Sequence, residues 1–302
     1  MKLIQIALSL VFTTMTGLLH QAGTAAETTN LVTAPQSNQR YKIAVCDWMI
    51  LKRQKLGAFL LAREIGADGV ELDMGSLGPR ETFDNQLTNA AAAQVFRNKA
   101  QELQLEIPSM AMSGFYAQSF AERPTVPRMV EDCFATMRRM QVKTVFLPLG
   151  VCDLVKFPEL RPAVVARLKA VGRQAQAAGI VVGIETSLPA AEEVKLLDEI
   201  DSPAIQIYFN FANAIQNKRD LIAELRTLGA QRICQIHCTN SDRAWLQNDP
   251  DLDFRAIKKT LDDMGWSGWL VVERSRDPQD VHNVKRNYGT NVAYLKSVFQ
   301  QQ

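Results

Sequence analysis

Two hydrophobic patterns alternate along the chain from residue 41 onward. Short runs rich in valine and isoleucine are followed by longer stretches in which apolar residues recur every three or four positions. The short runs predict eight β-strands, over 42–49, 69–75, 106–113, 144–150, 180–186, 204–210, 232–239 and 268–275. The longer stretches predict a helix after each strand. Several of these helices should end at a glycine shortly before the next strand, at Gly66, Gly179, Gly229 and Gly265.

This alternation indicates the fold class. Eight strand-helix units within about 260 residues, with no linker between them, are typical of an α/β protein with the (β/α)8 TIM-barrel fold. An open doubly wound sheet is the alternative, but it rarely reaches so many even units. We therefore predict a single barrel domain over 41–302.

The first 26 residues follow a different pattern. Lys2 precedes an uncharged, mostly apolar run over 3–19, and small residues follow up to Ala26, which is typical of a cleaved secretory signal peptide. The run is short and interrupted by threonines, which argues against a membrane anchor. Residues 27–40 are polar and predict a flexible lead-in. We expect a periplasmic protein, with secretion from the cell as the alternative, and no membrane association after cleavage.

Charge and cysteine content exclude several classes of protein. Lys2 is the one charged residue among the first 26, so the remaining chain has 33 basic and 32 acidic residues. Such a balance gives no general attraction to a phosphate backbone, and we expect no nucleic-acid partner. The five cysteines are an odd number spread over a long chain, so we interpret them as buried thiols and not as a disulfide framework.

The segment RICQIHCT, over 232–239, places a histidine between two cysteines. In a β-strand, His237 would share a face with Gln235 and Ile233, and Cys234 and Cys238 would lie on the opposite face. Side chains on opposite faces of a sheet cannot bind one ion. We therefore reject a Cys/His zinc cluster here and expect His237 to find its partners elsewhere in the chain.

Polar residues occupy the carboxyl ends of the predicted strands, where barrels of this kind carry their reactive groups. They are Asp47, Glu71, Asp73, Ser113, Glu185, Asn210, His237 and Glu273. The last four come from strands five to eight, which are consecutive neighbours in a barrel. Two carboxylates, an imidazole and an amide oxygen would suit Mn²⁺, Mg²⁺, Zn²⁺ or Co²⁺, whereas a closed zinc site would use thiolates, which we expect to be absent from this face. The alternative is a core histidine with glutamates paired to basic residues.

The strand-end residues Glu185, Asn210, His237 and Glu273 are separated by 25, 27 and 36 positions. This series resembles that of the xylose isomerase-like barrel superfamily. That superfamily holds sugar isomerases and epimerases, hydroxypyruvate isomerase, inosose dehydratase and apurinic endonuclease. The resemblance covers the chain after residue 41. It implies that Glu185, Asn210, His237 and Glu273 bind a divalent metal ion and that the two glutamates move protons. The family usually has Asp, and His three residues later, where this chain has Asn210 and Asn213, which implies weaker metal binding.

Other residues near the strand ends are candidates for substrate binding. They are Trp48, Glu71, Tyr116, Asn213, Trp245, Arg274 and Arg276. The aromatic side chains suit stacking on a sugar ring, although single aromatic residues also serve as ordinary packing. The two arginines either orient substrate oxygens or pair with nearby aspartates at the surface. The polar loop over 240–251 suits a lid.

The resemblance and the expected export together imply a metal-dependent isomerase or epimerase that acts on a non-phosphorylated sugar or keto-sugar through an enediolate. A lyase or hydratase of 3-keto-glycosides and a non-catalytic sugar-binding barrel are the alternatives. The endonuclease branch is set aside because its three-zinc site needs many histidines, and only His237 and His282 follow residue 26. The expected partner is a small carbohydrate, and the sequence leaves a homo-oligomer open.

Overall fold

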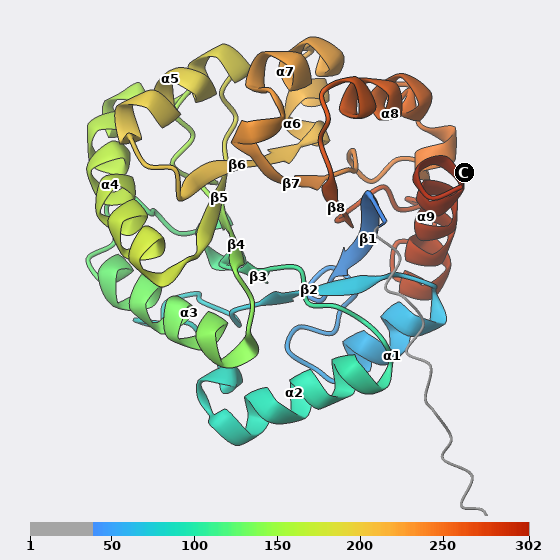
Figure 1. Ribbon diagram of the computed structural model, residues 1–302, viewed down its shortest axis with the longest axis horizontal. Helices are drawn as coiled ribbons and strands as arrows, with labels where there is room; N and C mark the ends of the chain where they lie inside the picture. Colours follow the sequence, from blue (N-terminus) through green and yellow to red (C-terminus); the bar gives the residue numbers. More distant parts are fainter. Residues whose placement is uncertain (1–38, 302) are drawn as a thin grey trace, which may run out of the picture. The chain divides into compact units, whose positions relative to one another are not determined.

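Eight parallel strands close into a barrel in the computed structural model, which describes residues 39–301 (Figure 1). The strands are β1 (Tyr41–Cys46), β2 (Gly69–Asp73), β3 (Met110–Ala111), β4 (Thr144–Pro148), β5 (Val181–Glu185), β6 (Ile205–Asn210), β7 (Ile233–His237) and β8 (Gly268–Val272). Pairing of β1 with β8 completes the ring. The predicted (β/α)8 TIM barrel is therefore confirmed. The expected signal peptide over 1–26 and all but the last two residues of the lead-in over 27–40 lie outside the described residues.

Helices surround the strands as an outer ring (Figure 1). They are α1 (Gly57–Glu64), α2 (Ala90–Glu102), α3 (Val126–Met140), α4 (Arg161–Ala178), α5 (Ala190–Ile200), α6 (Phe211–Gln216), α7 (Leu221–Leu228), α8 (Phe254–Asp263) and α9 (Val284–Phe299). In α4 the residues at helical spacing, such as Val164, Leu168 and Val171, are buried, and Gly179 ends the helix with a φ of 64°. None of the helices described is both long and apolar enough to cross a membrane.

Apolar side chains fill two layers. The larger layer lies between the strands and the helices. The smaller one lies inside the barrel and consists of Ala44, Cys46, Ala111, Phe146, Tyr208 and Val271. Val271 of β8 therefore points into the barrel. All five cysteines are free thiols, and four of them are buried.

Strand β3 is much shorter than predicted. The sequence suggested a strand over 106–113, but regular pairing covers only Met110–Ala111, with one isolated bridge between Gly69 and Glu106. Pro108 lies between these two paired positions and has no N–H group to donate to a neighbouring strand. The proline therefore interrupts the ladder.

Strand β7 does not alternate as predicted. Its register with β6 shifts, because Ile207 pairs with Ile233 but Tyr208 pairs with Gln235. Cys234 is left as the extra residue of a bulge. It lies beside Tyr208 in the inner layer, whereas Ile233 packs in the outer one, so our assignment of these two side chains was wrong. Cys238 packs in the outer layer and cannot share an ion with His237.

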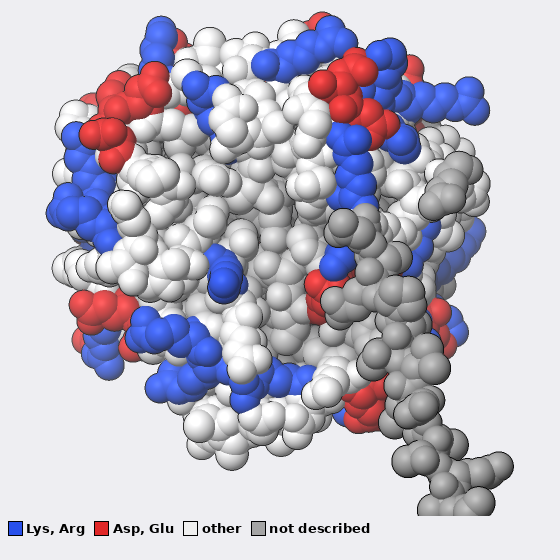
Figure 2. Space-filling view, in the orientation of Figure 1, with Lys and Arg blue, Asp and Glu red and all other residues white. Residues whose placement is uncertain are grey.

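Charged residues of both signs are spread over the surface. Figure 2 shows one face, on which lysine and arginine alternate with aspartate and glutamate around the rim. Neither sign covers this face. Many of these groups form ion pairs, such as Lys42 with Glu106 and Lys285 with Glu64.

Candidate active site

The carboxyl ends of β5 to β8 bring four predicted residues together. Glu185, Asn210 and His237 are the last residues of their strands, and Glu273 follows β8 directly. All four are buried. The Nδ1 atom of His237 lies 3.2 Å from Oε2 of Glu185 and 3.9 Å from Oε2 of Glu273. The four side chains therefore meet at one point, as the sequence predicted.

The side-chain amide of Asn210 links the two glutamates. Its Nδ2 atom donates to Oε2 of Glu185 at 2.9 Å and to Oε2 of Glu273 at 3.2 Å. Its Oδ1 atom accepts from the backbone N–H of Ala212 at 2.9 Å and caps the first turn of α6. That cap fixes which end of the amide faces the glutamates. In this arrangement Asn210 presents donors to the site, and its predicted role as a metal ligand through oxygen stays a prediction.

A third carboxylate, that of Glu71, lies on the side of His237 that faces away from Glu185. Oε1 of Glu71, from β2, is 3.3 Å from Nε2 of His237. Glu71 also accepts hydrogen bonds from Tyr208 at 2.6 Å and from Ser109 at 2.5 Å. A carboxylate that accepts from one ring nitrogen directs the other nitrogen forward and makes it a better ligand. Glu71 therefore contacts the Nε2 atom of His237, whereas we had proposed it as a substrate-binding residue.

The charges in this cluster determine the protonation of the imidazole. Burial alone would lower the pKa of His237, but the carboxylates of Glu273, Glu185 and Glu71 outweigh it and raise that pKa to about 10. Burial and the charge of Glu185 raise the pKa of Glu273, although His237 opposes them. Within the described part of the chain, no lysine or arginine forms an ion pair with Glu185 or Glu273. The alternative in which basic residues neutralise these glutamates is therefore not supported.

These donors suit a divalent cation. The carboxylates of Glu185 and Glu273 and the Nδ1 atom of His237 face one another, and oxygen and imidazole ligands are those that Mn²⁺, Co²⁺ and Zn²⁺ accept. Two buried carboxylates at hydrogen-bond distance from the same amide need positive charge nearby. Glu185, His237 and Glu273 would hold the ion, and Glu71 would support His237.

Cys46 brings a thiol to the same histidine. Its Sγ atom lies 3.7 Å from Nε2 of His237 and 3.8 Å from Oε1 of Glu71. Our expectation that this face lacks thiols was therefore wrong, because the side chain of the last β1 residue points into the barrel. The spacing of Cys46, Glu71 and His237 would allow a metal ion. We assign the three to hydrogen bonding, because Glu71 already accepts hydrogen bonds from the hydroxyl groups of Tyr208 and Ser109.

Tyr116 lies at the site, in the short helix η2 (Ser113–Tyr116) that follows β3. Its hydroxyl is 3.0 Å from Oε1 of Glu185 and 3.2 Å from Oε1 of Glu273. Burial and the two glutamate charges raise its pKa well above the usual value, so the phenol keeps its proton. The sequence identified Tyr116 as an aromatic surface for a substrate, but it is the hydroxyl that contacts the two glutamates.

Aromatic rings line the side of the site formed by the first half of the barrel. Trp48 stacks on Phe146 with ring centroids 6.4 Å apart and an interplanar angle of 8°. Phe146 also packs against Tyr116 and against His237. Trp48 is therefore beside the site, as predicted. Sequence analysis missed Phe146, although its inward position at the middle of a strand was a usable signal.

Three predicted substrate-binding residues have other partners. Asn213 donates to the backbone oxygen of Thr186 at 2.9 Å. The indole N–H of Trp245 donates to Asn287 at 2.8 Å. Arg276 forms a two-point ion pair with Asp242, which joins the loop after β8 to the loop after β7. Of the two roles considered for Arg276, pairing with an aspartate is the one observed, but the aspartate belongs to the loop after β7 and not to the loop of Arg276 itself.

The remaining predicted contact, Arg274, is exposed and follows Glu273 directly. Its positive charge helps to lower the pKa of Glu273 against the effect of burial. A substrate contact of Arg274 therefore remains a prediction.

Two buried aspartates at the ends of β1 and β2 form a separate network. Asp47 accepts from the backbone N–H of Gln54 at 2.8 Å and of Asp73 at 3.1 Å. Asp73 pairs with Arg53 at 3.2 Å. Burial raises the pKa of Asp73 to about 6, although Arg53 opposes this shift. The network connects the loop after β1 to β2.

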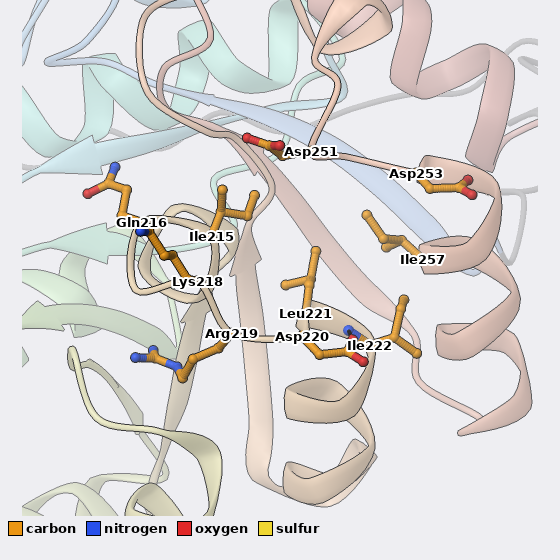
Figure 3. A pocket seen from close by; sticks show the side chains of 10 residues that line it. All are labelled: Ile215, Gln216, Lys218, Arg219, Asp220, Leu221, Ile222, Asp251, Asp253 and Ile257. Atoms are coloured by element: carbon orange, nitrogen blue, oxygen red, sulfur yellow. Dashed lines mark hydrogen bonds between the residues drawn. The ribbon is translucent and has the colours of Figure 1, made fainter.

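A cavity of about 570 Å³ lies apart from these residues, between α6, α7 and the start of α8 (Figure 3). Its walls include Ile215, Leu221, Ile222 and Ile257, with Lys218 at one side. None of Glu185, Asn210, His237 and Glu273 lines it. Asp220 and Asp253, also at its edge, cap the starts of α7 and α8. The cavity is therefore not the site described above.

Comparison with known proteins agrees with this architecture. A 2-epi-5-epi-valiolone 7-phosphate 2-epimerase from Actinoplanes sp. is 25% identical over 200 residues, which cover 64% of this chain and 71% of the relative. The structure of a D-psicose 3-epimerase in the presence of D-fructose has a TM-score of 0.67 at 12% identity, over 86% of this chain and 100% of that one. A 3-keto-D-glucoside 4-epimerase from E. coli has a TM-score of 0.65 at 18% identity, over 85% and 99% of the two chains.

These similarities support the sequence interpretation of the fold and of the enzyme class. The solved structures share the barrel fold. The expectation of an isomerase- or epimerase-like enzyme is confirmed by the epimerase relative. The model of the xylose isomerase-like TIM barrel family matches residues 59–298. Because this match covers most of the chain, the protein belongs to the xylose isomerase-like TIM barrel family.

Proposed function

We propose that this protein is a metal-dependent isomerase or epimerase that acts on a non-phosphorylated sugar or keto-sugar through an enediolate. One observation carries the proposal. Glu185 and Glu273 each direct one oxygen toward Asn210 and His237, and each directs its other oxygen to the hydroxyl of Tyr116. Two carboxylates that face a common point are what removal and return of a proton at carbon require.

The residues of the site have separate tasks in this mechanism. A divalent ion, when bound, would polarise the substrate carbonyl and an adjacent hydroxyl. One glutamate removes the proton from the neighbouring carbon, and the other returns a proton to the opposite face. Asn210 holds both carboxylates in place, and Glu71 orients His237. Trp48, which is partly exposed and stacks on the buried Phe146, offers a ring that suits the apolar face of a sugar.

Arginine pairing favours a substrate without phosphate, with the exception of Arg274, which is exposed beside Glu273 and has no ion pair among the described residues. Arg53, Arg219, Arg243 and Arg276 each pair with a carboxylate. Recognition of a phosphate group usually takes a free guanidinium fork. The epimerase relative has a phosphorylated compound in its name, so this part of the proposal needs its own test.

The test compares substrates and reports the fate of the proton. Purified protein with Mn²⁺ is incubated in deuterium oxide with D-fructose, D-tagatose, fructose 6-phosphate or 3-keto-glucosides, and the products are followed by NMR. We expect deuterium at a stereocentre next to the carbonyl of a non-phosphorylated substrate. Release of an aglycone would favour the lyase or hydratase instead. Binding without any exchange would favour the sugar-binding barrel.

Matched variants connect the activity to the site. Glu185→Gln should reduce turnover at least about 100-fold, as expected for loss of a general acid or base. Glu192→Gln changes a partly exposed glutamate of α5 that pairs with Lys195, and it should leave turnover unchanged. Equal activity of both variants would contradict the proposed role of Glu185.

Export to the periplasm is part of the proposal and rests on the pattern of the first 26 residues. Fractionation of cells that express the full chain tests it. We expect the shortened protein in the periplasmic fraction and its N-terminus after Ala26. Full-length protein in the cytoplasmic fraction would refute it.

A further inference from the structure

The hydroxyl of Tyr116 lies between the carboxylates of Glu185 and Glu273. It lies 3.0 Å from Oε1 of Glu185 and 3.2 Å from Oε1 of Glu273. These are the oxygens that remain after both Oε2 atoms have turned toward Asn210. The free oxygens of the two glutamates therefore converge on the phenol of Tyr116.

The reacting carbon of a substrate needs the same point. Two carboxylates that exchange protons with one carbon must both approach it to about 3–3.5 Å. The phenol oxygen meets this condition for both glutamates. Two groups cannot fill one position, so the carbon can enter only when the hydroxyl of Tyr116 leaves.

Resting on the proposed function, we propose that Tyr116 is a specificity-determining plug, whose hydroxyl holds the position of the reacting carbon until a polyhydroxylated ligand displaces it. A ligand gains entry when its own hydroxyl groups donate to the two Oε1 atoms in place of the Tyr116 hydroxyl. Molecules without such groups leave the plug in place. Tyr116 therefore selects substrates at the point of entry.

The surroundings of Tyr116 allow this movement in the side chain but not in the backbone. A Cβ atom on Gly150 would lie 2.4 Å from Cα of Tyr116, so the two main chains are in close contact. The ring is partly exposed and meets Phe146 at a tilted angle of 54°, with centroids 5.9 Å apart. Displacement is therefore a rotation of the side chain about a fixed backbone.

Two variants that each lose one phenol hydroxyl test the plug. Tyr116→Phe keeps the ring and removes the oxygen. Tyr41→Phe is the matched control, because Tyr41 gives a hydrogen bond to Asp262 at 2.6 Å from the first residue of β1, at the other end of the barrel. Binding of D-fructose and D-tagatose is measured by calorimetry with Mg²⁺ present.

We expect Tyr116→Phe to bind the ketose about 10-fold more tightly than the unchanged protein, because a state that blocks the site lowers apparent affinity in proportion to its population. Tyr41→Phe should bind as the unchanged protein does. Equal or weaker binding by Tyr116→Phe would overturn the plug, since the hydroxyl would then be neutral or would hold the ligand.

A second measurement separates failure of the plug from failure of the proposed function. Tyrosine labelled with ¹³C at the ring Cζ gives one NMR signal for each residue, and the two variants assign the signals of Tyr116 and Tyr41. Glycerol carries adjacent hydroxyl groups and needs no sugar specificity. We expect the Tyr116 signal to shift with glycerol while the Tyr41 signal stays. A Tyr116 signal that is unchanged up to molar glycerol overturns the plug, whereas absence of ketose binding alone counts against the proposed function.

Discussion

The Nε2 atom of His237 lies 3.3 Å from Oε1 of Glu71, so each nitrogen of this buried imidazole faces a carboxylate. Glu71→Gln should weaken Mn²⁺ binding about 10- to 100-fold, because a neutral amide no longer favours the tautomer that leaves Nδ1 free. Competition with a fluorescent chelator measures the affinity. Glu106→Gln, which changes a surface glutamate paired with Lys42, is the control. Unchanged Mn²⁺ affinity in folded Glu71→Gln would refute the role of Glu71.

Asn210→Asp should make stability depend more strongly on metal. The aspartate still caps α6, but it adds a third carboxylate beside Glu185 and Glu273. Without metal these charges repel, so the melting temperature should fall; with saturating Mn²⁺ it should recover, because the added charge tightens binding. Asn213→Asp is the control and should show no such dependence, since Asn213 donates to Thr186. A metal response no larger than that of the unchanged protein would contradict the prediction.

Glu193 of α5 should make the protein less stable as pH rises. Burial raises its pKa from 4.5 to about 8, although its hydrogen bond with Thr186 opposes this shift. The folded protein therefore holds a proton that the unfolded chain releases above pH 4.5. The stability from this group is complete below about pH 4.5 and is lost as pH rises to about 8.

Glu193→Gln removes this dependence because glutamine does not ionise. The free energy of unfolding, from urea titrations at several pH values, should differ between the variant and the unchanged protein by a few kcal/mol more at about pH 8 than at about pH 5. Glu192→Gln, which changes a partly exposed neighbour on the same helix, should give a curve parallel to that of the unchanged protein. A curve for Glu193→Gln that is also parallel would show that Glu193 is ionised in the folded state.

Gly183→Ala should destabilise the barrel by about 1–3 kcal/mol through overpacking. A methyl group there would lie 2.5 Å from Sγ of Cys234 and 3.0 Å from Cβ of Tyr208. Gly289→Ala is the matched control, because its methyl group would lie 3.5 Å from Ile65, and alanine favours a helix by up to about 1 kcal/mol. Urea denaturation measures both changes. Equal stability of the two variants would refute the close packing inside the barrel.

Much of the fold could be predicted because it depends on local hydrophobic pattern. Short apolar strands and amphipathic helices locate all eight units, and residues at the carboxyl ends of parallel strands must share one end of the barrel. This geometry alone brings Glu185, His237 and Glu273 together.

The errors and omissions have a different origin. The bulge at Cys234 arises from pairing between β6 and β7, which simple alternation does not reveal. The orientation of the Asn210 amide depends on the cap of α6, and the thiol of Cys46 reaches His237 only because β1 closes the ring. The partner of Arg276 lies in the loop after the preceding strand. Each of these contacts joins separate elements, so composition and spacing within one element could not indicate it.

The candidate substrate contacts and the candidate catalytic residues come from different halves of the barrel. Trp48, Tyr116 and Phe146 come from the first four strands and the loops after them, whereas Glu185, Asn210, His237 and Glu273 come from the last four. Under the proposed function, replacement of Trp48 or Tyr116 would change which molecule is retained, whereas replacement of residues in the second half, or of Glu71 in the first, would change whether it reacts. A new substrate preference could thus arise through changes at Trp48 or Tyr116 while Glu185, Asn210, His237 and Glu273 stay unchanged.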